Sequence, residues 1–200
     1  MTGHYQKAYF LLSVAQTEQL PPDQGIEVAI VGRSNAGKSS VLNRITQNKG
    51  LARVSKTPGR TQMINIFVID DNRRLADLPG YGYAKVPLAA KRKWAETVDA
   101  YLSGRECLQG LVLVMDIRHP FRELDQHLLD YCDKRHLPVH ILLNKSDKLS
   151  KNEIANVMRE VKKHLADYEM PVTLQLFSAL RGVGVKELYA VLDKWYGYHP

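Results

Sequence analysis

The sequence predicts an α/β protein of three layers, with helices on both faces of a mostly parallel six-stranded sheet. Apolar runs alternate with helical patterns after residue 25, and this alternation is typical of βαβ units. A second observation is the short connector at residues 70–72, which joins two of the apolar runs. Because so few residues permit only a hairpin-type connection, one strand is expected to run antiparallel.

Short apolar segments mark the expected strands, and apolar residues three or four positions apart mark the expected helices. Ser150 followed by Glu153 forms a capping box at the start of one helix. Strands are expected near residues 27–31, 63–69, 73–77, 110–116, 138–143 and 173–177. Helices are expected after the loop that follows the first strand and over residues 88–103, 121–135, 151–167 and 184–196.

Residues 1–25 are expected to form an N-terminal leader ahead of a domain that spans residues 26–200. The leader ends in Pro21-Pro22, and its residues Tyr9, Leu11 and Ser13 indicate an edge strand. No internal repeat divides the chain further. The 200 residues therefore predict one domain, large enough to bury a core without metals or disulfides.

The segment that follows the first expected strand matches the phosphate-loop pattern G-x-x-x-x-G-K-[ST]. In this pattern the backbone N–H groups wrap the phosphates, Lys38 reaches the β- and γ-phosphate oxygens, and the Ser39 hydroxyl binds Mg²⁺. An apolar strand before the loop and a helical pattern after it favour a P-loop NTPase. The expected phosphate-binding residues are Gly32, Arg33, Ser34, Asn35, Ala36, Gly37, Lys38, Ser39 and Ser40.

Two segments that follow later strands also suit a nucleotide site. In the first, Asp77-Leu78-Pro79-Gly80, the carboxylate can hold Mg²⁺ through water and the Gly80 amide can reach the γ-phosphate. The same four residues also form a good turn. In the second, Asn144-Lys145-Ser146-Asp147, the Asp147 carboxylate can accept from guanine N1–H and from the 2-amino group that adenine lacks. A backbone N–H of Ser178-Ala179-Leu180, after the last strand, would meet guanine O6.

In order and spacing, these segments resemble the Era-like group of TRAFAC-class GTPases. The combination of residues 32–40, 56–62 and 77–84 looks specifically like the EngB family, also called YihA or YsxC. The resemblance covers about residues 25–200, with Ser146 and Leu180 as tolerated variations on the usual guanine motifs. It implies a six-stranded GTPase domain, Mg²⁺-dependent binding of GTP and GDP, a role in large ribosomal subunit assembly, and a link to cell division and septation in bacteria.

The resemblance also implies which residues assist hydrolysis. Lys38, Gly80 and Thr61 are the expected catalytic residues, with Thr61 completing the Mg²⁺ shell only when GTP is bound; Thr57 is a rival for that role. Asn35 resembles the phosphate-loop asparagine that helps to bind K⁺ in Era-like GTPases, although a plain loop hydrogen bond is an alternative. Because Tyr81 stands where Ras-like enzymes carry glutamine, slow intrinsic turnover is expected. The first switch adds Gly59, Arg60 and Gln62 to the expected nucleotide contacts.

The net charge of +7 suggests a polyanionic partner, although a basic chain also attracts its own nucleotide. The expected partner is the large ribosomal subunit or its precursor, contacted through rRNA and ribosomal proteins.

Two cysteines without metal-ligand spacing indicate a reduced, cytoplasmic protein, although residues 7–15 faintly resemble a signal peptide. A monomer without a membrane span is expected. The basic residues gather in two segments: Lys49, Arg53, Lys56 and Arg60, and Lys85, Lys91, Arg92 and Lys93.

Two other function classes remain open from the sequence. One is a regulatory GTPase that acts directly on a division protein or a membrane surface, although no lipidation site or amphipathic anchor supports it. The other is a P-loop nucleoside or sugar kinase, which needs an acceptor site and usually a lid. The guanine-type segment that ends in Asp147 argues against the kinase.

Overall fold

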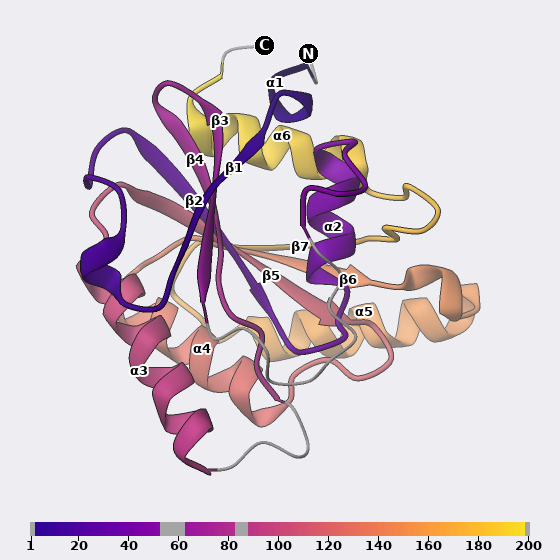
Figure 1. The fold of residues 1–200 in the computed structure, drawn as a ribbon. Helices are drawn as coiled ribbons and strands as arrows, with labels where there is room; N and C mark the ends of the chain where they lie inside the picture. The colour runs from indigo at the N-terminus through magenta and orange to yellow at the C-terminus, as the bar shows by residue number, and fades with distance from the viewer. Residues whose placement is uncertain (1–2, 53–62, 83–87, 199–200) are drawn as a thin grey trace.

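The computed structural model describes residues 3–52, 63–82 and 88–198, and it has helices on both faces of a central sheet (Figure 1). The strand order is β1-β3-β4-β2-β5-β6-β7. The strands are β1 (Tyr9–Val14), β2 (Ile26–Gly32), β3 (Ile64–Asp70), β4 (Arg73–Asp77), β5 (Leu108–Asp116), β6 (Val139–Asn144) and β7 (Val172–Leu176). The helices are α1 (Gly3–Gln6), α2 (Lys38–Ile45), α3 (Leu88–Gly104), α4 (Glu123–Lys134), α5 (Lys151–Leu165) and α6 (Val185–Tyr196), with 3₁₀ turns η1 (Thr17–Gln19) and η2 (Ser146–Lys148).

The sheet has seven strands: the six expected ones and β1, which forms at the edge strand expected in the leader and pairs with the outer edge of β3. Only β3 runs against the others, as the short β3–β4 connector predicts. The strand signal of β1 is weak because its apolar residues Tyr9, Phe10 and Leu11 face solvent, and because the register shifts between Phe10 and Leu12. An exposed, bulged edge strand does not show the alternation of a half-buried one.

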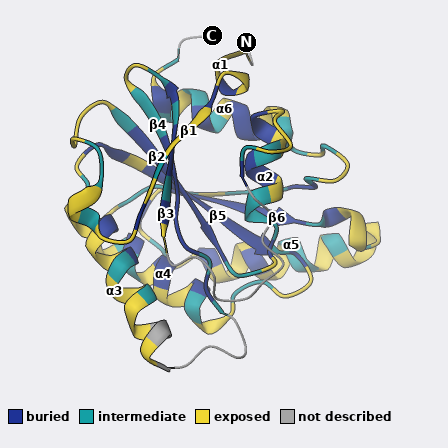
Figure 2. Ribbon diagram, viewed as in Figure 1, coloured by how far each residue is buried: buried dark blue, intermediate teal, exposed yellow. Residues whose placement is uncertain are grey.

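Each face of the sheet carries its own apolar core. On one face α3, α4 and α5 pack through residues such as Leu102, Leu129 and Val161. On the other face α2 and α6 pack through residues such as Leu42 and Leu188, with α1 at the edge (Figure 1). The central strands are buried from both sides (Figure 2), which explains their continuous apolar sequences. In the part of the chain that the structure describes, no helix combines the length and apolarity that crossing a membrane requires.

The leader is tied to the sheet by a buried ion network at the amino end of β2. The Glu27 carboxylate is fully buried and accepts from Arg74, from Arg105 at 3.0 and 3.1 Å, and from the Tyr101 hydroxyl at 2.6 Å. The two arginines also donate to leader carbonyls, Arg105 to Pro21 at 2.8 Å and Arg74 to Pro22 at 3.0 Å. Since a buried carboxylate is costly unless it is paired, this network fixes the path of the leader into β2.

A buried histidine links β6 to β7. Nδ1 of His140 lies 2.7 Å from the Thr173 hydroxyl, and Nε2 lies 2.8 Å from the Gln175 side-chain oxygen. Burial lowers the pKa of His140, against a smaller opposing effect of the hydrogen bond with Gln175. The folded protein therefore keeps this imidazole neutral at a pH where the unfolded chain binds a proton.

We expect the free energy of unfolding to fall as the pH drops below about 6.5, because only the unfolded state then protonates this group. His140→Leu should lower stability at about pH 8 by roughly 1–3 kcal/mol, since Thr173 and Gln175 lose their partner. The further loss between about pH 8 and about pH 5.5 should be smaller in this variant than in the wild type. Urea unfolding followed by circular dichroism measures both effects, with exposed His127→Leu as the control. An unchanged pH dependence in His140→Leu would contradict the prediction.

Candidate functional site

The described residues that were expected to bind nucleotide meet at one edge of the sheet. Gly32, Asp77 and Asn144 end the strands β2, β4 and β6, and Ser178 follows β7. These four strands run parallel, so their carboxyl ends lie at the same edge. Crevices outside the carboxyl ends of parallel strands are the usual ligand sites of such sheets.

The phosphate loop connects β2 to α2, and its two glycines occupy places that no side chain fits. A Cβ added to Gly32 would lie 2.4 Å from the Val114 carbonyl oxygen. Gly37 has a φ of +100°, and its Cβ would lie 2.3 Å from Nδ2 of Asn144. Lys38 then begins α2, so the backbone N–H groups of the first turn point toward the loop and favour an anion there.

Lys38 hydrogen-bonds to the carboxylate of Asp77 across the loop. Both side chains are largely buried, and the second oxygen of Asp77 accepts from Nδ2 of Asn65 at 3.1 Å. The Asp77 carboxylate and the Ser39 hydroxyl next to Lys38 provide hard oxygen donors, which is the chemistry that Mg²⁺ prefers. The residues present therefore fit this ion, while the 3–52, 63–82 and 88–198 ranges contain no cluster of three or more His, Cys, Asp or Glu residues suited to a metal.

The segment after Asp77 packs directly against the phosphate loop. Leu78 is fully buried, and its amide donates to the Ile30 carbonyl at 2.9 Å. A Cβ added to Gly80 would lie 3.4 Å from the Gly32 carbonyl oxygen and 3.6 Å from the Ser34 hydroxyl. That Ser34 hydroxyl is buried and has no hydrogen-bond partner among the described residues. A Cβ at these distances would make ordinary van der Waals contacts, so position 80 lies directly beside the phosphate loop.

Tyr81 is turned into the protein rather than toward the phosphate loop. Its hydroxyl donates to the buried carboxylate of Asp125 on α4, and its ring packs on Trp94 with centroids 4.9 Å apart. Burial raises the pKa of Tyr81 well above its ordinary value, and burial also raises the pKa of Asp125. The Trp94 indole N–H donates to the Pro79 carbonyl at 2.7 Å. Both aromatic side chains therefore pack within the fold.

Asn144 connects the end of β6 to the phosphate loop and to the segment after β7. Its amide nitrogen donates to the Ala36 carbonyl at 2.8 Å, and its amide oxygen accepts from the Ala179 N–H at 3.2 Å. Its own carbonyl accepts from Ile117 at 2.9 Å. The phosphate loop and the segment after β7 are thus held to the end of β6.

Lys145 lies between the phosphate loop and the end of β5. Its ammonium donates to the Asn35 carbonyl and to the Asp116 carboxylate, the latter at 2.9 Å. Burial alone would raise the pKa of Asp116, but hydrogen bonds from Arg118 and Lys145 hold it well below its usual range. Asp116 did not figure in the sequence prediction, although it ends an apolar strand as Asp77 and Asn144 do.

Asp147 lies beside the segment that follows β7. The hydroxyl of Ser178, which is fully buried, donates to its carboxylate at 2.5 Å, and this bond lowers the pKa of Asp147. The carboxylate is therefore ionised at neutral pH. Ala179 contacts Asn144 as described above, while Leu180 is 67% exposed.

Part of the predicted site lies outside the described residues. This applies to Gly59, Arg60, Thr61 and Gln62 of the expected first switch, and to the rival Thr57. Of the remaining residues, Asn35 has a φ of 64° and is exposed, and Ser40 is exposed at the start of α2.

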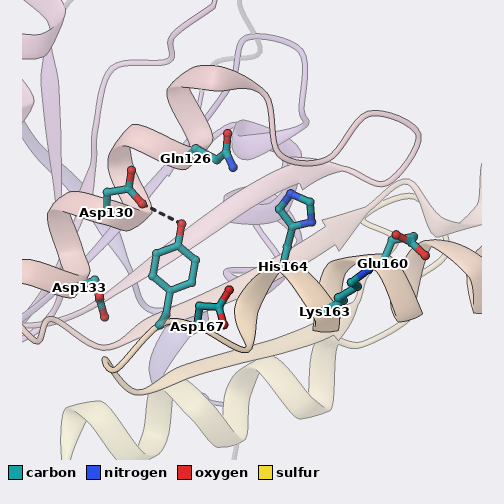
Figure 3. Close-up of a pocket in the computed structure, with 8 residues that line it drawn as sticks. Gln126, Asp130, Asp133, Glu160, Lys163, His164 and Asp167 are labelled. Carbon is teal, nitrogen blue, oxygen red and sulfur yellow. Dashed lines mark hydrogen bonds between the residues drawn. The ribbon is translucent and has the colours of Figure 1, made fainter.

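Two hollows border these elements. A cavity of about 190 Å³ lies against the phosphate loop, between residues 33–36 and Asp116, Asp125 and Lys145. A more open groove of about 560 Å³ lies between α4 and α5, away from the loop (Figure 3). Carboxylates of that groove hold the chain that follows α5: Asp133 accepts from two backbone amides at 2.7 and 2.8 Å, and Asp130 accepts from Tyr168 at 2.9 Å. Of these two hollows, the smaller is the one lined by residues predicted to bind nucleotide, namely Arg33, Ser34, Asn35, Ala36 and Lys145.

The sequence profile of a family described as 50S ribosome-binding GTPase matches residues 27–145, and that of the elongation factor Tu GTP binding domain matches residues 96–197. A curated relative, probable GTP-binding protein EngB of Coxiella burnetii (strain RSA 331 / Henzerling II), is 55% identical over 196 residues, which cover 98% of this chain and 96% of the relative. The protein of that name from Aliivibrio fischeri (strain MJ11) is 50% identical over 195 residues, covering 98% and 91%.

Solved structures share the fold. A crystal structure of a probable GTP-binding protein engB aligns with a TM-score of 0.70 at 20% identity, covering 86% of this chain and all of that one. Aquifex aeolicus Era bound to GDP·AlF4⁻ aligns with a TM-score of 0.66 at 23% identity, covering 86% of this chain and 57% of that one. With a phosphate loop, Asp77 and the Asn144–Asp147 segment at one sheet edge and full-length relatives at 50–55% identity, the chain belongs to the EngB family of P-loop GTP-binding proteins.

Proposed function

We propose that this chain is a slow GTPase that acts as a nucleotide-gated factor in large ribosomal subunit assembly, and that normal bacterial cell division and septation depend on it. The observation that carries the proposal is the meeting of the phosphate loop, Asp77 and the Asn144–Asp147 segment at one edge, in a chain that matches the 50S ribosome-binding GTPase family. The net charge of +7 supports an RNA-containing partner.

In the proposed site, the loop amides from Gly32 to Ser40 and the Lys38 ammonium hold the β- and γ-phosphates. Ser39 would bind Mg²⁺ directly and Asp77 would bind it through water, with Thr61 as a further ligand when GTP is bound. When bound, Mg²⁺ offsets the negative charge that grows on the phosphates as the β–γ bond breaks. Gly80 lies close enough to the loop for its backbone N–H to serve the γ-phosphate.

The guanine base would be read by Asp147 and by the turn after β7. Because the Asp147 carboxylate is ionised, it accepts hydrogen bonds from N1–H and from the 2-amino group. Asn144 keeps this turn beside the phosphate loop. A site built on such bonds rejects adenine because the carboxylate would lose its partners.

Slow turnover is supported by the direction of Tyr81. Water must be aligned with the γ-phosphorus for attack, and Ras-like enzymes use a glutamine for this. The Tyr81 hydroxyl is instead engaged with buried Asp125, so it does not replace that glutamine. We therefore propose that a partner or a bound cation raises the rate.

Nucleotide state would control how the basic residues near the switches meet RNA. Loss of the γ-phosphate removes the Thr61 and Gly80 contacts together, so residues 48–62 and 80–93 would relax. Lys49, Arg92 and Lys93 are exposed, which suits contact with RNA phosphates.

Asp147→Asn should exchange the base preference of the protein, because an amide can donate to the 2-oxo group of xanthine while it serves the guanine 2-amino group poorly. Affinity for GTP should fall by about 100-fold or more, and XTP should become the preferred ligand. Titration calorimetry with GTP, XTP and ATP in Mg²⁺ measures this. Asp167→Asn, in the groove between α4 and α5, is the matched control. Tight ATP binding by the wild type would reject the proposed guanine site.

Potassium should raise GTP turnover relative to sodium if the Asn35 side chain helps to hold K⁺ where other GTPases place an arginine finger. Asn35→Gly should abolish this difference; glycine suits the left-handed backbone at this position. Phosphate release in matched KCl and NaCl measures the effect, with exposed Asn152→Ala as the control. Equal rates of the wild type in both salts would disprove a K⁺ role.

Purified large subunits should retain the protein in co-sedimentation with a non-hydrolysable GTP analogue more strongly than with GDP. The double variant Arg92→Ala/Lys93→Ala should bind more weakly, and its salt slope should be smaller by about 2. Lys162→Ala/Lys163→Ala, on exposed positions of α5, is the charge-matched control. Binding to a division protein or to anionic vesicles without binding to subunits would favour the regulatory alternative.

A further inference from the structure

Arg44, in the last turn of α2, spans the turn that connects β7 to α6. Its Nε donates to the carbonyl of Ala179 and its Nη2 donates to the carbonyl of Leu180, each at 2.7 Å. The Cζ atom of Arg44 would lie 3.8 Å from a Cβ added to Gly182, so the guanidinium also lies beside this glycine of the turn. A planar fork of N–H donors is well suited to two adjacent oxygens.

Holding two successive carbonyls fixes two successive peptide planes. Because a trans peptide keeps its C=O and the following N–H in one plane and on opposite sides, the Ala179 carbonyl sets the direction of the Leu180 N–H. The Leu180 carbonyl likewise sets the direction of the Arg181 N–H, which donates to the Ser178 hydroxyl at 3.1 Å. Arg44 therefore sets the directions of the Leu180 and Arg181 N–H groups.

Other contacts hold the inner part of the same turn. The Ala179 N–H meets Asn144, Ser178 donates to Asp147, and the Gly182 N–H donates to the Ser178 carbonyl at 2.7 Å. The Leu180 side chain is 67% exposed and offers little packing. The two hydrogen bonds from Arg44 thus fix the outer part of the turn, at the Ala179 and Leu180 carbonyls.

The helix that carries Arg44, α2, starts at Lys38 of the phosphate loop. Lys38 and Arg44 are six residues apart on α2, a rise of about 9 Å. The far end of α2 is itself fixed, because the Tyr189 hydroxyl on α6 donates to the Ile45 carbonyl at 2.6 Å. One short, anchored helix therefore contacts both the phosphate loop and the turn after β7.

We propose that Arg44 is a positioning residue for guanine recognition: its fork on the Ala179 and Leu180 carbonyls orients the Leu180 N–H, which would meet guanine O6. This inference rests on the proposed guanine site and adds a residue to it. Arg44 acts through the turn and does not touch the base. Its loss should therefore weaken recognition of the 6-oxo group while Asp147 still recognises the 2-amino group.

Two guanine analogues separate these contributions. In 6-thioguanosine diphosphate a weaker acceptor replaces O6, while N1–H and the 2-amino group are kept; inosine diphosphate keeps O6 and lacks the 2-amino group. The wild type should bind GDP more tightly than either analogue. In Arg44→Ala, affinity for GDP should fall about five- to tenfold. The ratio of the affinities for GDP and 6-thio-GDP should approach one. The ratio of the affinities for GDP and IDP should stay unchanged.

Two further variants separate geometry from charge. Arg44→Lys keeps the positive charge but replaces the fork with one ammonium, so its GDP/6-thio-GDP ratio should also fall. Lys186→Ala removes an exposed charge from the first turn of α6 and should keep the ratio of the wild type. Thermal unfolding of each variant without nucleotide checks that the fold is retained.

Three results would overturn the inference. The first is an Arg44→Ala protein with the GDP/6-thio-GDP ratio of the wild type, and the second is an equal loss of both analogue ratios. The third is a wild type that does not distinguish GDP from 6-thio-GDP, because no N–H of the turn would then read O6. A wild type that binds ADP as tightly as GDP would reject the proposed guanine site itself, and the inference with it.

Discussion

The amide of Asn144 is the contact on which the nucleotide site depends. It is buried at the end of β6 and reaches the phosphate loop through the Ala36 carbonyl and the turn after β7 through the Ala179 N–H. The fit is close enough that Gly37 cannot carry a side chain. Because one planar amide bonds to both segments, it fixes how far the phosphate loop lies from the turn after β7.

The two lysines at this edge of the sheet, Lys38 and Lys145, each form an ion pair with an aspartate. The Lys38 ammonium is paired with Asp77, and the Lys145 ammonium is paired with Asp116, which also accepts from Arg118. Buried or half-buried ammonium groups need such partners to stay charged. The same partners limit the rotamers of both lysines in this structure.

The sequence allowed the central strands and the order of the site segments to be predicted, because these features rest on runs of adjacent residues. The buried strands β2, β5 and β6 carry continuous apolar runs, and the phosphate loop has fixed spacing. The contributions of Asn65, Asp116, Asp125 and Arg44 could not be predicted, because each depends on a partner far away in the chain. The strand β1 was expected only as an edge strand of the leader and was not counted in the six-stranded sheet; three of its apolar residues, Tyr9, Phe10 and Leu11, are exposed.

The buried Glu27 network bears on where this chain can be divided. Periodicity places the start of the domain near residue 26, yet the arginines that neutralise Glu27 also hold the carbonyls of Pro21 and Pro22. Removing the leader would take the Pro21 and Pro22 carbonyls away from these arginines and would uncover the hydrogen-bonding edge of β3, which could then pair with other chains. The strand β1 thus covers the edge of β3, and a protein shortened to begin near residue 26 would be prone to aggregate through that edge.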